Sequence, residues 1–163
     1  MKVLFAAGGS AGHVDPALAT ARQLDAEILF AGNQSGIEKK LVQRANFQFQ
    51  HIPKLAFPRS FSLRNLLWPV RAFIVLFKAI SISSKVDVIV GFGGYVSAYF
   101  YLAGFLLRKP VIAHEANALP GISTKKCICC FDISVNSSNC GKHRGTCFAL
   151  RKLIYGVSST LQC

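Results

Sequence analysis

A glycine-rich stretch near the start of the chain, Gly8-Gly9-Ser10-Ala11-Gly12-His13, has the composition of a ligand-binding turn. It follows an apolar run at 2–7, which predicts a strand, and it precedes Val14-Asp15-Pro16, which is typical of a helix start. We expect Asp15 to be the N-cap and Pro16 the first helical residue, where a missing N–H costs nothing. Glycines let backbone N–H groups approach an anion at a helix N-terminus. The alternative is an ordinary turn between a strand and a helix, with no ligand.

Two further segments of this kind follow apolar runs. Gly91-Phe92-Gly93-Gly94-Tyr95 comes after the run 87–90, and His114-Glu115-Ala116-Asn117 comes after the run 110–113. In an open parallel sheet, ligands bind beyond the carboxyl ends of the strands. The three segments are therefore expected to meet at one edge of a sheet and to form a ligand site there.

A dinucleotide is a poor fit to this pattern. Its fingerprint is G-x-G-x-x-G, with an acidic residue at the end of the second strand that binds a ribose. Here the glycines are Gly8, Gly9 and Gly12, and the second apolar run ends in Gly32-Asn33-Gln34. Because no acid follows that run, we do not expect an NAD site, and nothing in residues 1–126 implies a metal or another cofactor.

The elements that would position these turns alternate along the chain. The alternation predicts an α/β fold with a doubly wound, Rossmann-like parallel sheet. In the second helix, Glu38 is expected on the solvent side together with Lys39, Lys40 and Arg44. The expected strands are 2–7, 27–31, 47–52, 87–90 and 110–113, and the expected helices are 16–24, 35–45, a long one starting at Ser62, and 96–107.

The long helix has two chemical faces. Its apolar residues recur at spacings of three and four, which predicts one helical stripe, and Pro69 should kink or restart the helix. A second line of basic residues recurs every seven positions. With Trp68, Phe73 and Phe77 nearby, this line suits an anionic membrane surface; the alternative is a solvated face on a core helix. The stripe is Leu63, Leu66, Leu67, Val70, Phe73, Ile74, Phe77 and Ile80, and the basic line is Arg64, Arg71, Lys78 and Lys85.

Composition limits the class of protein. The chain has 163 residues, 52% of them hydrophobic, and a formal charge of +12, which favours one globular domain with acidic partners. We see no nucleic-acid-binding motif and therefore expect no nucleic acid partner. The sequence shows no secretory signal and no apolar run that would span a bilayer easily, so we expect a cytoplasmic protein.

The last part of the chain differs in composition. Residues 1–126 contain no cysteine, whereas 127–163 contain all 6. The spacing does not match paired C-x-x-C ligands, so metal binding is a weak alternative, and a reducing cytoplasm disfavours disulfides. We interpret 1–126 as one domain and 127–163 as an atypical tail, for which a shifted reading frame is our hypothesis. The weak metal-binding alternative would use Cys127, Cys129, Cys130, Cys140, His143 and Cys147.

The three glycine and histidine motifs together carry a family resemblance. GGSAGH with VDPALA, then GFGGYVS, then HEANALPG, in this order, resemble the amino-terminal half of the MurG family. The resemblance covers residues 2 to about 126. It implies the amino-terminal domain of a GT-B glycosyltransferase that transfers N-acetylglucosamine (GlcNAc) from UDP-GlcNAc to lipid I in peptidoglycan synthesis. It departs from the usual family motifs at Ser10, Ala11, Asp15 and Ala116.

The resemblance also implies roles for residues of this chain. Ser10, Ala11, Gly12 and Asn117 match positions that contact the sugar nucleotide, and His13 could assist deprotonation of the acceptor or could simply hold the turn. Glu115 is expected to orient its neighbours. The family is peripheral to the cytoplasmic face of the cell membrane, which favours the membrane role of Arg64, Trp68, Arg71, Lys78 and Lys85. Backbone N–H groups expected at the acceptor diphosphate are those around Gly8, Gly9, Gly12, Gly93, Gly94 and Tyr95.

Because a GT-B enzyme works between two domains and the resemblance covers one, the chain alone is expected not to transfer GlcNAc. An alternative is a membrane-anchored acceptor-binding half whose UDP-GlcNAc-binding half is a separate protein. A nucleotide-binding protein of unrelated use is a third possibility.

Overall fold

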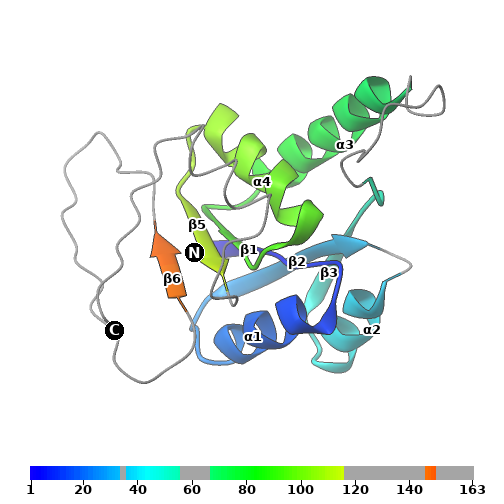
Figure 1. The fold of residues 1–163 in the computed structure, drawn as a ribbon. Coiled ribbons are helices and arrows are strands. Elements are labelled where there is room, and N and C mark those ends of the chain that lie inside the picture. Colours follow the sequence, from blue (N-terminus) through cyan, green and yellow to red (C-terminus); the bar gives the residue numbers. More distant parts are fainter. Residues whose placement is uncertain (34–35, 56–66, 116–145, 150–163) are drawn as a thin grey trace.

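The computed structural model describes residues 1–33, 36–55, 67–115 and 146–149. Within them, strands and helices alternate as the sequence predicts, and most strand ends shift by only one or two residues (Figure 1). The strand at 146–149 was not expected. The strands are β1 (Lys2–Ala6), β2 (Glu27–Asn33), β3 (Gln48–Ile52), β4 (Val88–Gly91), β5 (Val111–Glu115) and β6 (Thr146–Ala149). The helices are α1 (Ala11–Ala21), α2 (Ile37–Arg44), α3 (Trp68–Ser83) and α4 (Gly94–Leu106).

The strands form one sheet in the order β3-β2-β1-β4-β5-β6. The first five are parallel to one another, which confirms the predicted doubly wound parallel sheet, and β6 pairs antiparallel with β5. In the central register, Phe5 of β1 pairs with Phe30 of β2 on one side and with Val90 of β4 on the other. The chain therefore builds outward from β1 in both directions, and β1 and β4 flank the point where the strand order reverses.

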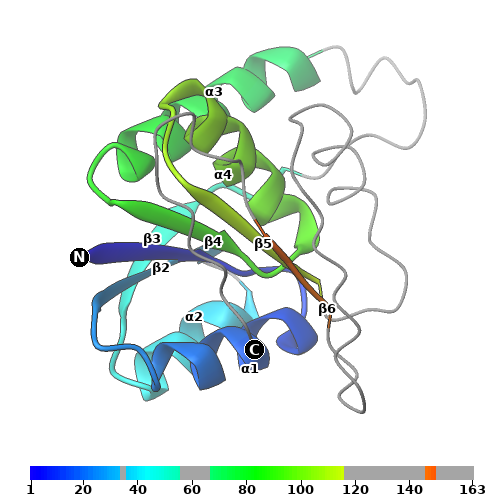
Figure 2. The same cartoon turned by 90° about the vertical axis from the view of Figure 1, so that its left-hand side faces the viewer.

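Helices cover both faces of the sheet, with α1 and α2 on one face and α3 and α4 on the other (Figures 1 and 2). Alternate residues of β1 belong to different cores, because side chains of a strand point to opposite faces. Leu4 packs with α3 and α4, whereas Val3 and Phe5 pack with α1 and α2. Covering on both faces explains why β1 and β4 are almost wholly apolar.

The start of α1 differs from the prediction. The helix begins at Ala11, with Ser10 as its extended N-cap (φ −158°, ψ 159°), so Asp15 is not the cap and Pro16 lies inside the helix. The glycine turn is complete at Gly9, whose φ is +100°, and the helix therefore follows at once. Pro16 lacks the N–H that would bond the carbonyl of Gly12, but that carbonyl lies in the first turn at the exposed Gly12, where water can replace the bond.

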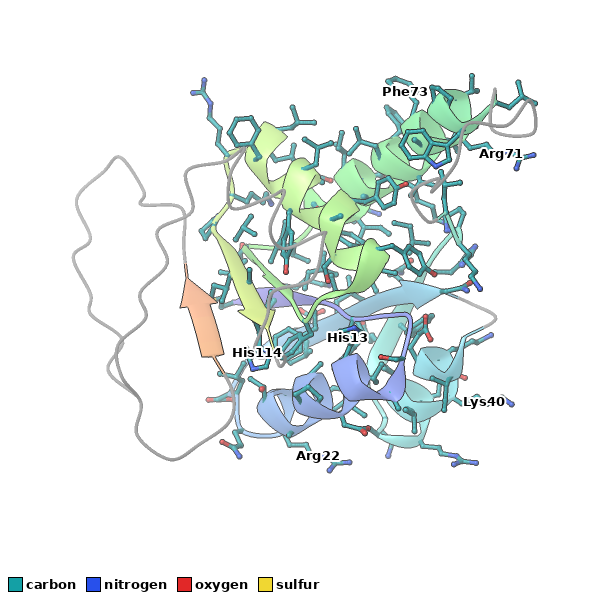
Figure 3. All side chains as sticks on the ribbon, in the orientation of Figure 1. His13, Arg22, Lys40, Arg71, Phe73 and His114 are labelled. Atoms are coloured by element: carbon teal, nitrogen blue, oxygen red, sulfur yellow. The ribbon has the colours of Figure 1, made fainter. Side chains whose placement is uncertain are left out.

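Helix α3 begins at Trp68, with Pro69 in its first turn, and the predicted helix start at Ser62 lies outside the described residues. Its predicted apolar stripe, however, is not the buried face. Phe73 and Phe77 are 69% and 67% exposed, and Val70 and Ile74 are exposed as well. The opposite side packs into the core through Val75, Ala79 and Ile82, with Ala72 and Leu76 partly buried. Figure 3 shows Phe73 on the side of α3 that faces away from the sheet.

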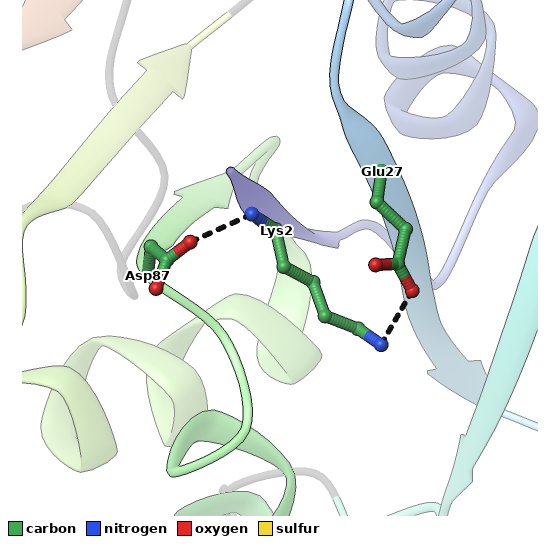
Figure 4. A network of polar contacts seen from close by, with 3 residues as sticks. All are labelled: Lys2, Glu27 and Asp87. Carbon is green, nitrogen blue, oxygen red and sulfur yellow. Dashed lines mark hydrogen bonds and ion pairs between the residues drawn. The ribbon is translucent and has the colours of Figure 1, made fainter.

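The amino-terminal edge of the sheet is held by polar contacts of Lys2 (Figure 4). Its backbone N–H donates to Asp87 Oδ2 at 2.7 Å, and its Nζ lies 2.6 Å from Glu27 Oε1. These contacts tie β1 to β2 and to the residue before β4. They lie at the edge opposite the glycine turns, because the turns follow the carboxyl ends of the strands.

Candidate functional site

The two glycine turns lie at the topological switch point of the sheet. One follows β1 and the other follows β4, and these neighbouring strands lead to helices on opposite faces (Figure 2). In doubly wound folds this crevice, beyond the carboxyl ends of the strands, is where ligands bind. The predicted meeting of 8–13 and 91–95 at one edge is therefore confirmed.

The two turns touch each other closely. A Cβ added to Gly94, whose φ is +78°, would overlap the carbonyl oxygen of Gly8, and one added to Gly8 would lie 2.7 Å from Val96 Cγ2. The Phe92 N–H donates to the Ala6 carbonyl at 2.9 Å. The buried Ser97 hydroxyl lies 2.8 Å from that carbonyl oxygen and 2.7 Å from that of Gly93. Small residues at both turns are therefore required by this close contact.

Both helices that begin here have open amino-terminal ends. Ser10 precedes α1 and Gly93 precedes α4, and neither makes a side-chain capping hydrogen bond. Neither helix has an acidic residue in its first turn. Within the described part of the chain, no side-chain cap or first-turn acid occupies these two helix starts, and the positive ends of the two helix dipoles favour an anion there.

His13 lies between the two turns. A Cβ at Gly93 would be 3.0 Å from His13 Cε1 and 3.1 Å from Nδ1, so the imidazole packs on the backbone of the second turn. Nδ1 is buried and has no hydrogen-bond partner among the described residues. His114, at the end of β5, packs against the Phe92 ring with centroids 5.1 Å apart. Figure 3 shows both histidines in the middle of the molecule, near the carboxyl ends of the central strands.

Glu38 is the residue of this region that the sequence analysis placed wrongly. It was expected on the solvent side of α2, but it is only 2% exposed. Its Oε1 accepts the backbone N–H of Asn33 at 3.0 Å, so an acid does lie at the end of the second strand although it comes from the following helix. The acidic residue in the first turn of a helix was the available signal, but it is equally typical of a solvated helix start.

Tyr95 joins this corner to the second glycine turn. Burial raises the pKa of its phenol, the charge of Glu38 raises the pKa further, and a hydrogen bond with the Asn33 side chain lowers it. On the same helix, burial and the neighbouring Tyr95 raise the pKa of Tyr99, whose hydroxyl donates to the Leu55 carbonyl at 3.1 Å. Tyr95 thus lies at the rim of the crevice and Tyr99 beside it.

The structure brings together most of the residues predicted for the site. Gly9, Ser10 and Gly12 are exposed at the first turn, whereas Gly8 and Gly93 are buried in the contact between the turns. Asn117, Ala116 and Arg64 lie outside the described residues, as do most of the cysteines. Among the residues that the structure describes, no group of three or more His, Cys, Asp or Glu side chains could hold a metal ion.

The residues predicted for a membrane surface lie apart from the turns, on α3 and just after it. Arg71 and Lys85 are exposed, and Trp68 and Lys78 are partly buried. Trp68 also lines an apolar cavity of about 310 Å³ between α3 and α4, with Phe73, Leu76 and Tyr99 among its other walls. None of the helices in the described part of the chain is both long enough and apolar enough to cross a membrane.

The parallel sheet, the helices on both faces and the glycine turns at the switch point define a Rossmann-like α/β domain of the kind that GT-B glycosyltransferases contain. Comparison with known proteins gives the family. The profile of the glycosyltransferase family 28 N-terminal domain matches residues 3–128, and the chain belongs to this family.

Named relatives agree with this assignment. The chain is similar to the UDP-N-acetylglucosamine–N-acetylmuramyl-(pentapeptide) pyrophosphoryl-undecaprenol N-acetylglucosamine transferase of Tropheryma whipplei, with 42% identity over 157 residues, 89% of this chain and 43% of that protein. The protein of the same name from Thermobifida fusca is 40% identical over 136 residues, 77% of this chain and 35% of that one. The crystal structure of Acinetobacter baumannii MurG superposes with a TM-score of 0.68 at 33% identity, over 77% of this chain and 38% of that chain. The chain thus spans about two fifths of the length of these relatives.

Proposed function

We propose that residues 1–126 are the acceptor-binding half of an enzyme that transfers GlcNAc from UDP-GlcNAc to lipid I in peptidoglycan synthesis. The observation that carries this proposal is the meeting of two uncapped helix N-termini at the switch point of the sheet. An acceptor joined to its lipid by a diphosphate presents the anionic group that such a site favours. The names of the relatives supply the sugar and the lipid.

In this proposal the diphosphate of the acceptor lies across the two turns. Gly9, Gly12, Gly94 and Tyr95 are the exposed or half-exposed residues whose N–H groups would face it, while the buried Gly8 and Gly93 allow the turns to meet. The donor would approach the exposed start of α1 at Ser10, Ala11 and Gly12, together with Asn117. Ser10 is exposed, and its hydroxyl makes no capping bond to α1 among the described residues, which supports this role.

We propose that His13 is the general base. It would accept the proton of the acceptor 4-hydroxyl while that oxygen forms the new bond to the anomeric carbon of GlcNAc, and the bond from that carbon to the UDP oxygen breaks, releasing UDP. The position of His13 between the two glycine turns supports this proposal, and its buried Nδ1 side, packed on the backbone of Gly93, leaves Nε2 as the nitrogen for this role.

The exposed side of α3 is proposed to rest on the cytoplasmic face of the cell membrane. The α3 apolar face, defined as Val70, Phe73, Ile74 and Phe77, is exposed next to Arg71. Such a face flanked by basic residues suits the interface of an anionic bilayer. Helix α3 follows β3 and therefore begins at the same edge of the sheet as the glycine turns, so that a lipid tail in the bilayer and a diphosphate at the turns are compatible.

Amide chemical shifts would test acceptor binding directly. The chain is titrated with a short-chain lipid I analogue, and with the same muropeptide lacking the diphosphate as a control. We expect the amides of 9–13 and 93–95 to shift with the diphosphate-bearing ligand alone. Shifts confined to other regions, or equal shifts with the control, would contradict the proposal.

Vesicle flotation would test the membrane face. Burial of a Phe side chain that is 69% exposed in water is worth about 1–2 kcal/mol, so Phe73→Glu should weaken binding to anionic vesicles roughly tenfold. Gln23 is exposed just after the end of α1, away from α3. Gln23→Glu changes the net charge by the same amount and should have little effect on vesicle binding. Equal losses for the two variants would show that net charge, and not this face, governs binding.

A further inference from the structure

Glu38 is a buried carboxylate without an ion-pair partner in the described part of the chain, and it lies beside the first glycine turn. Its side chain is enclosed by three glycines from three different segments. A Cβ at Gly8 would lie 3.2 Å from its Oε1, one at Gly32 would lie 2.8 Å from its Cγ, and one at Gly36 would overlap the carboxylate. The local backbone thus leaves room for this one side chain, although burying a charge is costly.

The carboxylate orders the end of β2 and, through it, Tyr95. Oε1 of Glu38 accepts a hydrogen bond from the Asn33 backbone N–H at 3.0 Å, which holds Asn33 in place. The side chain of Asn33 in turn forms a hydrogen bond with the Tyr95 hydroxyl. Tyr95 Cε1 in turn lies 3.9 Å from a Cβ placed on Gly9, so the ring lies over the exposed part of the first turn. Tyr95 therefore extends from the start of α4 across the end of β1 to the end of β2.

The electrostatics of this corner favour a neutral phenol. Burial raises the pKa of Tyr95, and the charge of Glu38 raises it further. The hydrogen bond with the Asn33 side chain lowers that pKa. A phenol can accept a hydrogen bond from an amide N–H and still donate its own proton to another acceptor. A neutral phenol can donate to a phosphate oxygen, whereas a phenolate would repel it.

We propose that Glu38 is a positioning residue which, through Asn33, holds the Tyr95 hydroxyl over the first glycine turn as a hydrogen-bond donor to the acceptor diphosphate. This role rests on the proposed function. The Tyr95 hydroxyl would add a side-chain donor to a site otherwise built from backbone N–H groups, and the buried Glu38 would contribute to ligand binding by positioning it.

A double-mutant cycle separates this role from general support of the fold. Glu38→Gln keeps the size of the side chain and an acceptor oxygen for Asn33 but removes the charge, and Glu38→Ala removes both. Tyr95→Phe removes the donor. Binding of the short-chain lipid I analogue should weaken about tenfold in Glu38→Ala and about tenfold in Tyr95→Phe, and no further when the two are combined. Tyr99→Phe, on the same helix, is the matched control and should bind normally.

A spectroscopic signature completes the test. With ¹³C-labelled tyrosine, the titration midpoint of Tyr95 should fall in Glu38→Gln, because the charge that raises its pKa is gone, while binding stays within about threefold of wild type. Two results would overturn the proposal: losses of binding affinity that add in the Glu38→Ala/Tyr95→Phe double mutant, or an unchanged titration midpoint of Tyr95 in Glu38→Gln. If Glu38→Ala does not fold, the midpoint of Tyr95 in Glu38→Gln is the deciding measurement. A wild-type chain that fails to bind the analogue would instead overturn the proposed function, whatever the Tyr95 midpoint.

Discussion

The contact between the two glycine turns makes Gly94→Ala the most informative single substitution. Gly94 has a φ of +78°, a backbone conformation that costs an L-residue about 1–2 kcal/mol. The new methyl would also overlap the carbonyl oxygen of Gly8, a residue whose backbone is confined because the Val96 and Glu38 side chains lie close to its Cα. Relief of such an overlap by backbone movement typically costs about 1–3 kcal/mol. The free energy of unfolding should therefore fall by about 2–5 kcal/mol.

Gly12→Ala is the matched control. Its new methyl would have only Ser10 Oγ nearby, at 3.9 Å, and Gly12 lies in α1 with an ordinary helical φ. Ala should therefore stabilise that helix by about 0.5–1 kcal/mol. Urea unfolding followed by far-UV circular dichroism measures both variants against wild type. If Gly94→Ala unfolds within about 0.5 kcal/mol of Gly12→Ala, the two turns do not meet as described.

Three further substitutions probe the sheet. Phe5→Ala removes a fully buried ring that contacts two other aromatic rings, and urea unfolding should show a loss of about 3–5 kcal/mol. Lys2→Ala breaks a partly exposed ion pair and should cost at most about 1 kcal/mol in the same assay, a loss that salt should diminish. The pKa of His51 lies below 6.5, chiefly because of burial and then because of the charges of Lys78 and Lys39. The folded state therefore favours the neutral imidazole. The stability that this provides is complete above pH 6.5 and is lost as the pH falls through the pKa of His51 in the folded state. His51→Gln should therefore flatten the loss of stability between about pH 7 and pH 5 in urea titrations.

The sheet edge could be predicted because two independent patterns agree there. Apolar runs of strand length indicate parallel strands buried on both faces, and glycines directly after two of them indicate turns with close backbone contacts. Topology then brings 8–13 and 91–95 together without any knowledge of side-chain positions. The family motifs lie on these same turns, which is why fold and family were predicted together.

Individual side chains were harder to place, for physical reasons. Asp15 and Pro16 have the residue types of a helix start, yet Ser10 begins α1 because the turn already ends at Gly9. Glu38 looks like a solvated acid, and only the three-dimensional arrangement of glycines from separate segments shows that its carboxylate is enclosed. Such an enclosure depends on contacts between distant parts of the chain, which hydrophobic periodicity does not report.

Helix α3 shows most clearly what an apolar pattern leaves undecided. Both of its sides are apolar, so the spacing of Phe73 and Phe77 is as compatible with a core as with an exposed surface. The opposite side packs into the core because its residues, Val75 and Ala79 among them, are smaller and pack closely beside α4. The larger aromatic side chains remain exposed, although contact of apolar side chains with water is unfavourable. Under the proposed function a bilayer supplies the reason for this exposure, and it does so at the sheet edge where the acceptor diphosphate would bind.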